Sequence, residues 1–224
     1  MCRHRWRLSH LLRFDGIMES RKLPAAPSIR GRNERIFRIT QTVCRAVLSM
    51  FFRMETSGVQ HLPRKEAFIL LPKHQRWEDI PLLSLATPRP LYYVAKSELF
   101  CNPLSNWFLS SLGGIPLNRQ RPLESRRSLL ALICFLKEGE GAVVFPEGTY
   151  FQHKMGPGQV GMVRLILSRL TIPFIPVGIR YSRKGPRIVV RVKFGKAFHA
   201  DPKTSANTLV DRMMTEIARL SDLV

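Results

Sequence analysis

The sequence predicts an α/β fold: a single domain with a largely parallel, mixed β-sheet flanked by helices, preceded by an N-terminal amphipathic helix. From residue 56 onwards, short apolar runs alternate with segments of helical periodicity, which is typical of a sheet with helices packed on its faces. The length of 224 residues suits one such domain with a substantial core and is too short for two full domains. Hydrophobic residues make up 45% of the chain, which excludes a disordered protein.

The first 34 residues are basic, rich in arginine and serine, and contain the turn-forming Pro24 and Pro27. We expect residues 1–34 to be poorly ordered. Met18 lies inside this segment, so the sequence leaves open whether translation starts at Met1 or at Met18. We assign no function to this segment.

An amphipathic helix is predicted next, over residues 35–55. Apolar residues recur there at helical spacing and share one face, which comprises Ile36, Ile39, Val43, Val47, Met50 and Met54 and is widened by Phe37, Leu48 and Phe51. The other side carries Arg35, Arg38, Arg45 and Arg53. The helix either packs on its own domain or lies in a membrane interface with its apolar side down. The wide apolar face and the purely basic polar face favour the second interpretation.

The main domain is predicted to span residues 56–224. Buried strands are expected at residues 67–71, 91–95, 142–145, 174–180 and 188–194, because each is a short apolar run. Helices are expected at about 123–137, 160–170 and 205–220. Gly139 and Gly141 mark the end of the first of these helices.

The net charge of +20 indicates an anionic partner, either a membrane surface or a nucleic acid. Seven lysines and arginines and no acidic residue lie between Val177 and Ala200, a run that could form a basic strip. The strip lacks a helix-turn-helix pattern or an RNP-like aromatic motif, which disfavours nucleic acid.

Membrane-spanning, secreted and metal-binding classes find little support in the sequence. No apolar run approaches the roughly 18 to 20 residues of a spanning helix, and the N-terminus lacks a secretory signal. We therefore expect a protein that is neither exported nor threaded through a bilayer. The four cysteines form no CxxC pair and the histidines are scattered, so neither a disulfide framework nor a metal site is expected.

A histidine and an aspartate follow the first predicted strand, in the stretch Pro72-Lys73-His74-Gln75-Arg76-Trp77-Glu78-Asp79. On a continuous helix, His74 and Asp79 would lie about 140° apart around the axis. They meet if His74 lies in the loop and Asp79 opens the next helix as its N-cap, which the following Ile80-Pro81 supports. The carboxylate would then hold one imidazole nitrogen and leave the other free as a general base. The alternative is a helix cap and an ordinary loop histidine.

Three further stretches are candidates for binding. Paired glycines in Gly113-Gly114-Ile115-Pro116-Leu117-Asn118-Arg119 predict a tight turn that presents Arg119, whose planar fork suits phosphate. The stretch Phe145-Pro146-Glu147-Gly148-Thr149 follows a buried strand, and ligands of open α/β sheets gather beyond the carboxyl ends of strands. In Ile175-Pro176-Val177-Gly178-Ile179, proline and glycine indicate either a close backbone approach or an edge strand with a bulge.

Together and in this order, these four stretches resemble the motifs of the glycerolipid acyltransferase family, which includes the 1-acylglycerol-3-phosphate acyltransferases. The resemblance covers residues 56 to about 200, and it implies an acyltransferase domain over residues 56–224. It implies one-step transfer of a fatty acyl group from acyl-CoA or acyl-carrier protein to a lysophospholipid hydroxyl, and 1-acylglycerol-3-phosphate is the expected acceptor. His74 would be the general base and Asp79 would orient it. Arg119 would bind the acceptor phosphate, and Glu147 with Gly148 and Thr149 would shape the acceptor site.

The family likeness also implies no covalent acyl-enzyme, and we expect no cofactor beyond the acyl-CoA or acyl-carrier protein co-substrate. A lysophospholipid acceptor lies in a bilayer, so we expect a peripheral, monotopic protein on the cytoplasmic face of an anionic membrane. Relatives often carry an arginine after the FPEGT motif and a lysine somewhat later, where this chain has Tyr150 and Gln159. Another lysolipid or a glycolipid hydroxyl therefore stays open as the acceptor. A basic nucleic-acid-binding protein is the alternative of a different class.

Overall fold

The fold was analysed in a computed structural model that describes residues 31–118, 125–200 and 204–223. Most of the predicted N-terminal segment, residues 1–30, lies outside the described residues, as does Arg119. The helices of the described part are α1 (Glu34–Phe51), α2 (Asp79–Ala86), α3 (Pro103–Ser111), α4 (Arg126–Lys137), α5 (Val160–Leu167) and α6 (Ala206–Leu220), with short 3₁₀ turns η1 (Val59–His61) and η2 (Ser97–Phe100). The strands are β1 (Phe52–Ser57), β2 (Phe68–Pro72), β3 (Tyr92–Lys96), β4 (Gly114–Leu117), β5 (Gly141–Val143), β6 (Phe174–Lys184) and β7 (Arg187–Phe194).

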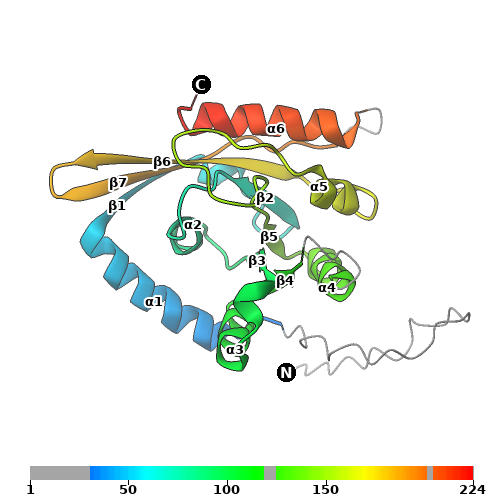
Figure 1. The fold of residues 1–224 in the computed structure, drawn as a ribbon, viewed down its shortest axis with the longest axis horizontal. Coiled ribbons are helices and arrows are strands. Elements are labelled where there is room, and N and C mark those ends of the chain that lie inside the picture. Colours follow the sequence, from blue (N-terminus) through cyan, green and yellow to red (C-terminus); the bar gives the residue numbers. More distant parts are fainter. Residues whose placement is uncertain (1–30, 119–124, 201–203, 224) are drawn as a thin grey trace, which may run out of the picture.

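The strands of the described residues form one seven-stranded sheet in the order β1-β7-β6-β2-β5-β3-β4 (Figure 1). Neighbouring strands run parallel except β6 and β7, which form an antiparallel hairpin. Parallel strands need crossover connections, and helices supply most of them here. The predicted α/β domain with a largely parallel, mixed sheet is confirmed.

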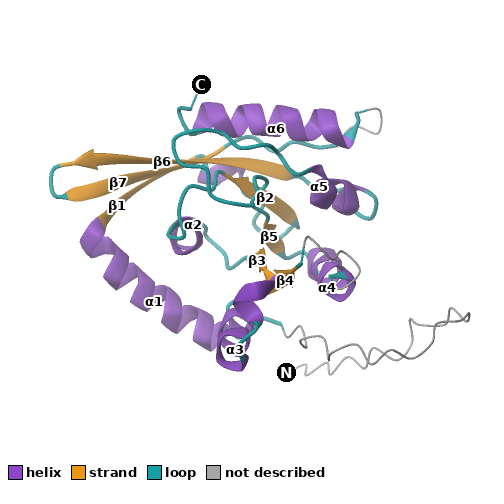
Figure 2. Ribbon diagram, viewed as in Figure 1, coloured by secondary structure: helices purple, strands orange, loops and turns teal. Residues whose placement is uncertain are grey.

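Helices cover both faces of the sheet (Figure 2). One apolar core joins side chains of α1 and α2 to the sheet, including Leu48, Leu82 and Leu83. The second core, on the opposite face, joins the sheet to α4, α5 and α6, for example through Leu132 and Ile166. The central strand β2 is fully buried between the two cores, as its unbroken apolar sequence predicts.

Helix α1 has two apolar strips with different environments. Phe37 and Leu48 are buried in the domain, and Gln41 Nε2 donates to the carbonyl of Ser84 on α2 at 3.1 Å. A separate strip made of Ile39, Val43, Val47 and Met50 is exposed, with residues 49–69% accessible. The helix therefore packs on its own domain and still leaves an apolar strip in solvent, and the membrane interpretation of that strip stays a prediction.

The end of α1 corrects the predicted boundaries. The helix stops at Phe51 and strand β1 starts at Phe52, with no connecting residue between them. Met54, which was expected on the apolar face of the helix, lies in β1 and pairs with Val190 of β7. The predicted domain boundary at residue 56 falls inside β1. The apolar spacing of α1 continues by chance to Met54. Pairing with β7 nevertheless makes these residues a strand.

Strand β6 is central in the sheet, paired with β2 on one side and β7 on the other, so the edge-strand alternative for residues 175–179 is wrong. The close-approach interpretation describes it better. A Cβ atom on Gly178 would come within 2.3 Å of the Leu220 backbone, at the end of α6. Sequence analysis also missed β1, α3 and β4.

Candidate functional site

The site lies at the carboxyl end of β2, where the chain turns into α2. His74 Nδ1 is 3.1 Å from Asp79 Oδ2. Both side chains are buried, with 10% of the His74 side chain and none of Asp79 accessible. Asp79 is the first residue of α2, so the loop between strand and helix brings together two residues that a continuous helix would hold apart. The meeting of the two side chains was predicted from the sequence, and the structure has this geometry.

Asp79 does not take the N-cap position that we expected. The cap position is Glu78, which makes no side-chain capping bond. The Asp79 carboxylate instead folds back over the preceding turn, where Oδ2 accepts the backbone N–H groups of Gln75 at 2.6 Å and Arg76 at 2.8 Å. The carboxylate thus satisfies the N–H groups of the loop, as a cap would, while it holds His74.

The His74 ring is fixed by aromatic neighbours as well as by Asp79. It stacks on Phe145 with ring centroids 3.8 Å apart, and it lies against Tyr150 at 4.4 Å. A hydrogen bond from Nδ1 to Asp79 favours the tautomer that leaves a lone pair on Nε2. In the described part of the chain, Nε2 makes no hydrogen bond. The arrangement is that of an oriented imidazole with one free nitrogen.

Directly behind this histidine lies a buried ion pair. Lys73 Nζ donates to both carboxylate oxygens of Glu147, at 2.8 and 2.7 Å, and neither side chain is accessible. Burial lowers the pKa of Lys73, while the hydrogen bond and the charge of Glu147 oppose this shift. Glu147 also accepts the backbone N–H groups of His74 at 3.0 Å and Gly156 at 2.6 Å. The pair therefore ties the His74 loop to the segment that follows β5.

The other predicted binding residues have different environments. Gly148 occupies the left-handed region with φ of 74°, and its N–H donates to the carbonyl of Phe145 in a tight turn. Thr149 is exposed, whereas Glu147 points inward to Lys73. The roles of Glu147, Gly148 and Thr149 in binding a substrate stay predictions. Arg119 lies outside the described residues.

Arg76 and Arg164 already have partners, whereas Lys154 is exposed. The Arg76 guanidinium lies 4.9 Å from the centre of the Tyr181 ring. Arg164, on α5, donates to Asn207 on α6 at 3.1 Å, and Lys154 is exposed in the loop before α5. Tyr150 and Gln159, which depart from the family pattern, are both exposed. The described residues contain no cluster of His, Cys, Asp or Glu that could hold a metal ion.

Sequence analysis missed Lys73 and Tyr181. Lys73 follows an apolar strand and Glu147 follows the adjacent parallel strand, so their opposite charges at neighbouring strand ends were a usable signal. Tyr181 donates its hydroxyl to Asp79 Oδ1 at 2.5 Å. It lies more than a hundred residues from Asp79 in the chain, and no local pattern marks it.

Comparison with known proteins assigns the family. A family model described as Acyltransferase matches residues 53–180, more than half of the chain. The chain belongs to the acyltransferase family. The match contains His74, Asp79, Lys73, Glu147 and the part of β6 that reaches Arg180. Two function classes were considered from the sequence. The family match supports the acyltransferase and does not support nucleic-acid binding.

Three proteins similar to this chain are acyltransferases. A 1-acyl-sn-glycerol-3-phosphate acyltransferase of Bacillus subtilis is 30% identical over 115 residues, 51% of this chain and 57% of that protein. A lyso-ornithine lipid O-acyltransferase of Pseudomonas aeruginosa is 27% identical over 64% of this chain and 53% of that protein. The chain thus matches little more than half the length of these curated relatives. The crystal structure of the acyltransferase PlsC of Thermotoga maritima shares the fold, with a TM-score of 0.67 and 22% identity over 83% of this chain and 78% of that one.

Proposed function

We propose that this protein transfers a fatty acyl group from an acyl thioester to the hydroxyl of a lysophospholipid, most simply 1-acylglycerol-3-phosphate, with His74 as general base. The observation that carries the proposal is the buried His74–Asp79 contact of 3.1 Å, with Nε2 unengaged by the described residues. Nε2 takes the proton of the acceptor hydroxyl, and the oxygen attacks the thioester carbonyl. The carbon–sulfur bond breaks and the thiol leaves with a proton. Asp79 stabilises the imidazolium that forms.

The direct test incubates the purified protein with a panel of lysolipids and with both acyl-CoA and acyl-carrier protein as donors. Products are identified by mass spectrometry. We expect one new ester per acceptor consumed and release of one thiol. Absence of product with every donor and acceptor, from a protein that is folded and bound to vesicles, would contradict the proposal.

The acceptor could also be a lysolipid without phosphate. Two observations favour this second candidate. Tyr150 lies against His74 where relatives often carry arginine, and lyso-ornithine lipid acyltransferases are among the similar proteins. Burial, and then the charge of Asp79, raises the pKa of Tyr150, so this wall of the site carries a neutral phenol and lacks the positive charge of an arginine.

Arg119 separates the two acceptor classes. If Arg119 grips an acceptor phosphate, Arg119→Ala raises the KM for lysophosphatidate far more than the KM for the thioester. Lysine at this position restores binding only in part, because it lacks the planar fork. With lyso-ornithine lipid as acceptor, the same variants leave the KM unchanged. Initial rates at varied acceptor and donor concentrations measure both effects, and equal changes in both KM values would mean that Arg119 has a structural role.

We further propose that the protein binds an anionic membrane surface through α1 and α3. No helix in the described ranges is long and apolar enough to cross a bilayer. A lysolipid lies in a bilayer, so the protein must bind the bilayer surface to reach it. The exposed apolar strip of α1 would contact the bilayer first. Glu34 is the single acidic residue of this helix. Its arginines would meet anionic headgroups, each worth about 1 kcal/mol near the surface.

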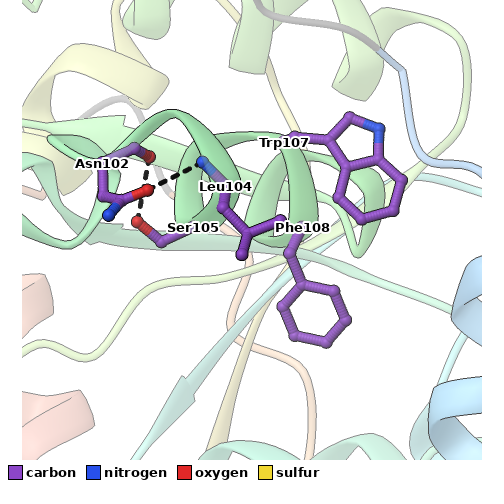
Figure 3. Close-up of a pocket in the computed structure, with 5 residues that line it drawn as sticks. All are labelled: Asn102, Leu104, Ser105, Trp107 and Phe108. Carbon is purple, nitrogen blue, oxygen red and sulfur yellow. Dashed lines mark hydrogen bonds between the residues drawn. The ribbon is translucent and has the colours of Figure 1, made fainter.

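Helix α3 adds a second exposed apolar surface. Leu104, Trp107 and Phe108 project from it around a shallow depression that Asn102 and Ser105 also line (Figure 3). The side chains of Leu104 and Trp107 are 71% and 50% accessible. The two helices are neighbours, since the N–H of Asn33, the cap of α1, donates to the carbonyl of Ser111 at the end of α3 (Figure 1). Tryptophan is favoured at membrane interfaces.

Charge placed on the exposed strip tests the membrane contact. We expect Val43→Glu/Val47→Glu to weaken co-sedimentation with anionic vesicles about tenfold or more, because burying each valine is worth about 1.5 kcal/mol or more. The matched control is Thr42→Glu/Ser49→Glu, which adds the same charge to the same helix on its polar side. Both pairs are exposed in the fold, so melting temperatures should stay close to the original. Equal vesicle binding by the two double variants would refute the assigned strip.

A further inference from the structure

Tyr181 reaches the site because β6 is longer than its neighbour β2. Pro72, the last residue of β2, is paired with Val177 of β6, and β6 runs on to Lys184 against β7 alone. Side chains alternate along a strand, so Tyr181 points to the same face as Val177 and Ile179. That face is the one covered by α2. The overhang therefore places Tyr181 beside the first turn of α2, just beyond the end of β2.

The two oxygens of the Asp79 carboxylate have different partners. Oδ2 faces His74 Nδ1 and also accepts the two backbone N–H groups of the loop. Oδ1 accepts the Tyr181 hydroxyl at 2.5 Å, and in the described part of the chain no other side chain donates to it. Because donors lie on both oxygens, the rotation of the carboxylate about its Cβ–Cγ bond is fixed. Without the tyrosine, only the bonds to Oδ2 would define which way that oxygen points.

We propose that Tyr181 is a positioning residue of the site, which acts by holding Asp79 in the rotamer that orients His74. The inference rests on the proposed function for the importance of the His74–Asp79 pair, and it adds a residue from a distant strand to that pair. The Tyr181 hydroxyl donates to the Asp79 carboxylate, and in the described part of the chain it makes no hydrogen bond to the imidazole. Its effect passes through the carboxylate.

The surroundings keep the tyrosine a hydrogen-bond donor. Burial, followed by the charge and the hydrogen bond of Asp79, raises the pKa of Tyr181 far above its usual range. The hydroxyl therefore stays protonated wherever the enzyme works. The titratable and charged groups that face the Tyr181–Asp79–His74 chain are Arg76 over the tyrosine ring, Glu78, Tyr150, and Lys73 with its partner Glu147.

Removal of the Tyr181 hydroxyl should shift the pH dependence of kcat/KM in a predictable direction. The tyrosine hydroxyl draws negative charge toward Oδ1, so its removal leaves more charge to attract a proton on His74. The protonated imidazole cannot act as base, and a higher pH is then needed to free it. The acid limb of the pH profile of kcat/KM should therefore move to higher pH in Tyr181→Phe. A purely structural tyrosine would lower the amplitude of the profile without moving it.

The experiment compares the full-length protein with Tyr181→Phe on vesicles that contain the acceptor lysolipid. We expect kcat to fall about ten- to a hundredfold, the range for a hydrogen bond to a charged group, with the KM of either substrate unchanged. Ser182→Ala is the matched control. It removes a hydroxyl from the next residue of the same strand, one that is buried and makes no hydrogen bond to the described residues, and it should leave the profile in place.

A second variant guards against a folding defect in Tyr181→Phe. Incorporation of 3-fluorotyrosine at position 181 keeps the ring and the hydroxyl but makes the hydroxyl a stronger donor. The acid limb should then move to lower pH, opposite to Tyr181→Phe. Shifts of opposite sign show that the Tyr181–Asp79 hydrogen bond acts on His74, as the proposal requires, and an acid limb that stays in place in both variants overturns the proposal.

Nuclear magnetic resonance of the His74 ring supplies a readout that does not depend on transfer. The ring-proton titration of His74 should move to higher pH in Tyr181→Phe and stay unchanged in Ser182→Ala. Suppose that His74→Ala still transfers acyl groups and that the His74 titration moves in Tyr181→Phe. The proposed base is then wrong, and the link from Tyr181 to His74 stands. If His74→Ala is inactive and the titration does not move, the inference about Tyr181 alone is overturned.

Discussion

His74→Ala should reduce acyl transfer by about 10²- to 10⁴-fold, because that is the contribution of a positioned general base. The KM values should change little, since in the proposed mechanism the ring takes a proton and does not bind the bulk of either substrate. The measurement is product formation on acceptor-containing vesicles. A folded variant that turns over near the original rate would remove His74 from the mechanism.

Folding controls decide how such a loss is interpreted. The His74 ring stacks on Phe145 and Tyr150, so its removal leaves a space beside two aromatic rings. His74→Phe keeps an aromatic ring there without a basic nitrogen, and it should be as inactive as His74→Ala with a melting temperature nearer the original. Asp79→Asn should also lose activity, but it disturbs the N–H groups of Gln75 and Arg76 as well.

The second large effect concerns stability. Lys73→Met should lower the free energy of unfolding by about 3–5 kcal/mol, because it leaves the Glu147 carboxylate buried without its counter-charge. Glu147→Gln should cost a similar amount by stranding the Lys73 ammonium. The double variant Lys73→Met/Glu147→Gln should be less destabilised than the sum of the two single variants. Urea denaturation of all four proteins gives the coupling free energy directly.

The half-exposed pair of Arg191 and Glu55 offers the matched comparison. Its atoms are 3.1 Å apart, and its side chains are 37% and 39% accessible. Arg191→Met should cost no more than about 1 kcal/mol, since solvent screens such a pair. If Lys73→Met costs no more than Arg191→Met, the buried pair does not anchor the loop that carries His74.

The parts of the site that could be predicted from the sequence are those with local patterns. The strand before His74 is an unbroken apolar run, and Asp79 followed by proline indicates the start of a helix, so the meeting of the two side chains followed from short-range rules. The boundaries of β2, β3, β5 and β7 fell within two residues of those expected. Strands β2 and β5 are buried on both faces, so their apolar composition alone marks them.

The rest depended on contacts between distant segments. Tyr181 enters the site only because β6 extends past β2, and strand length beyond a partner is set by pairing with β7. Residues 52–54 continued the helical pattern of α1, yet pairing with β7 made them a strand. The exposed state of Val43 and Val47 also required the fold, because a single amphipathic pattern cannot tell which apolar side chains meet the core.

The junction between α1 and β1 has a mechanical consequence. The helix passes into the sheet without a loop, and its other end is fixed by Arg32, whose side chain is 7% accessible, pairs with Glu34 and lies over the rings of Phe37 and Tyr92. A helix clamped at both ends cannot pivot on the domain. If its exposed strip docks on a bilayer as proposed, the whole sheet would take a fixed tilt and His74 would lie at a fixed height above the acyl chains. The enzyme would then select acceptors partly by depth, favouring lysolipids whose free hydroxyl lies at the level where the imidazole is held.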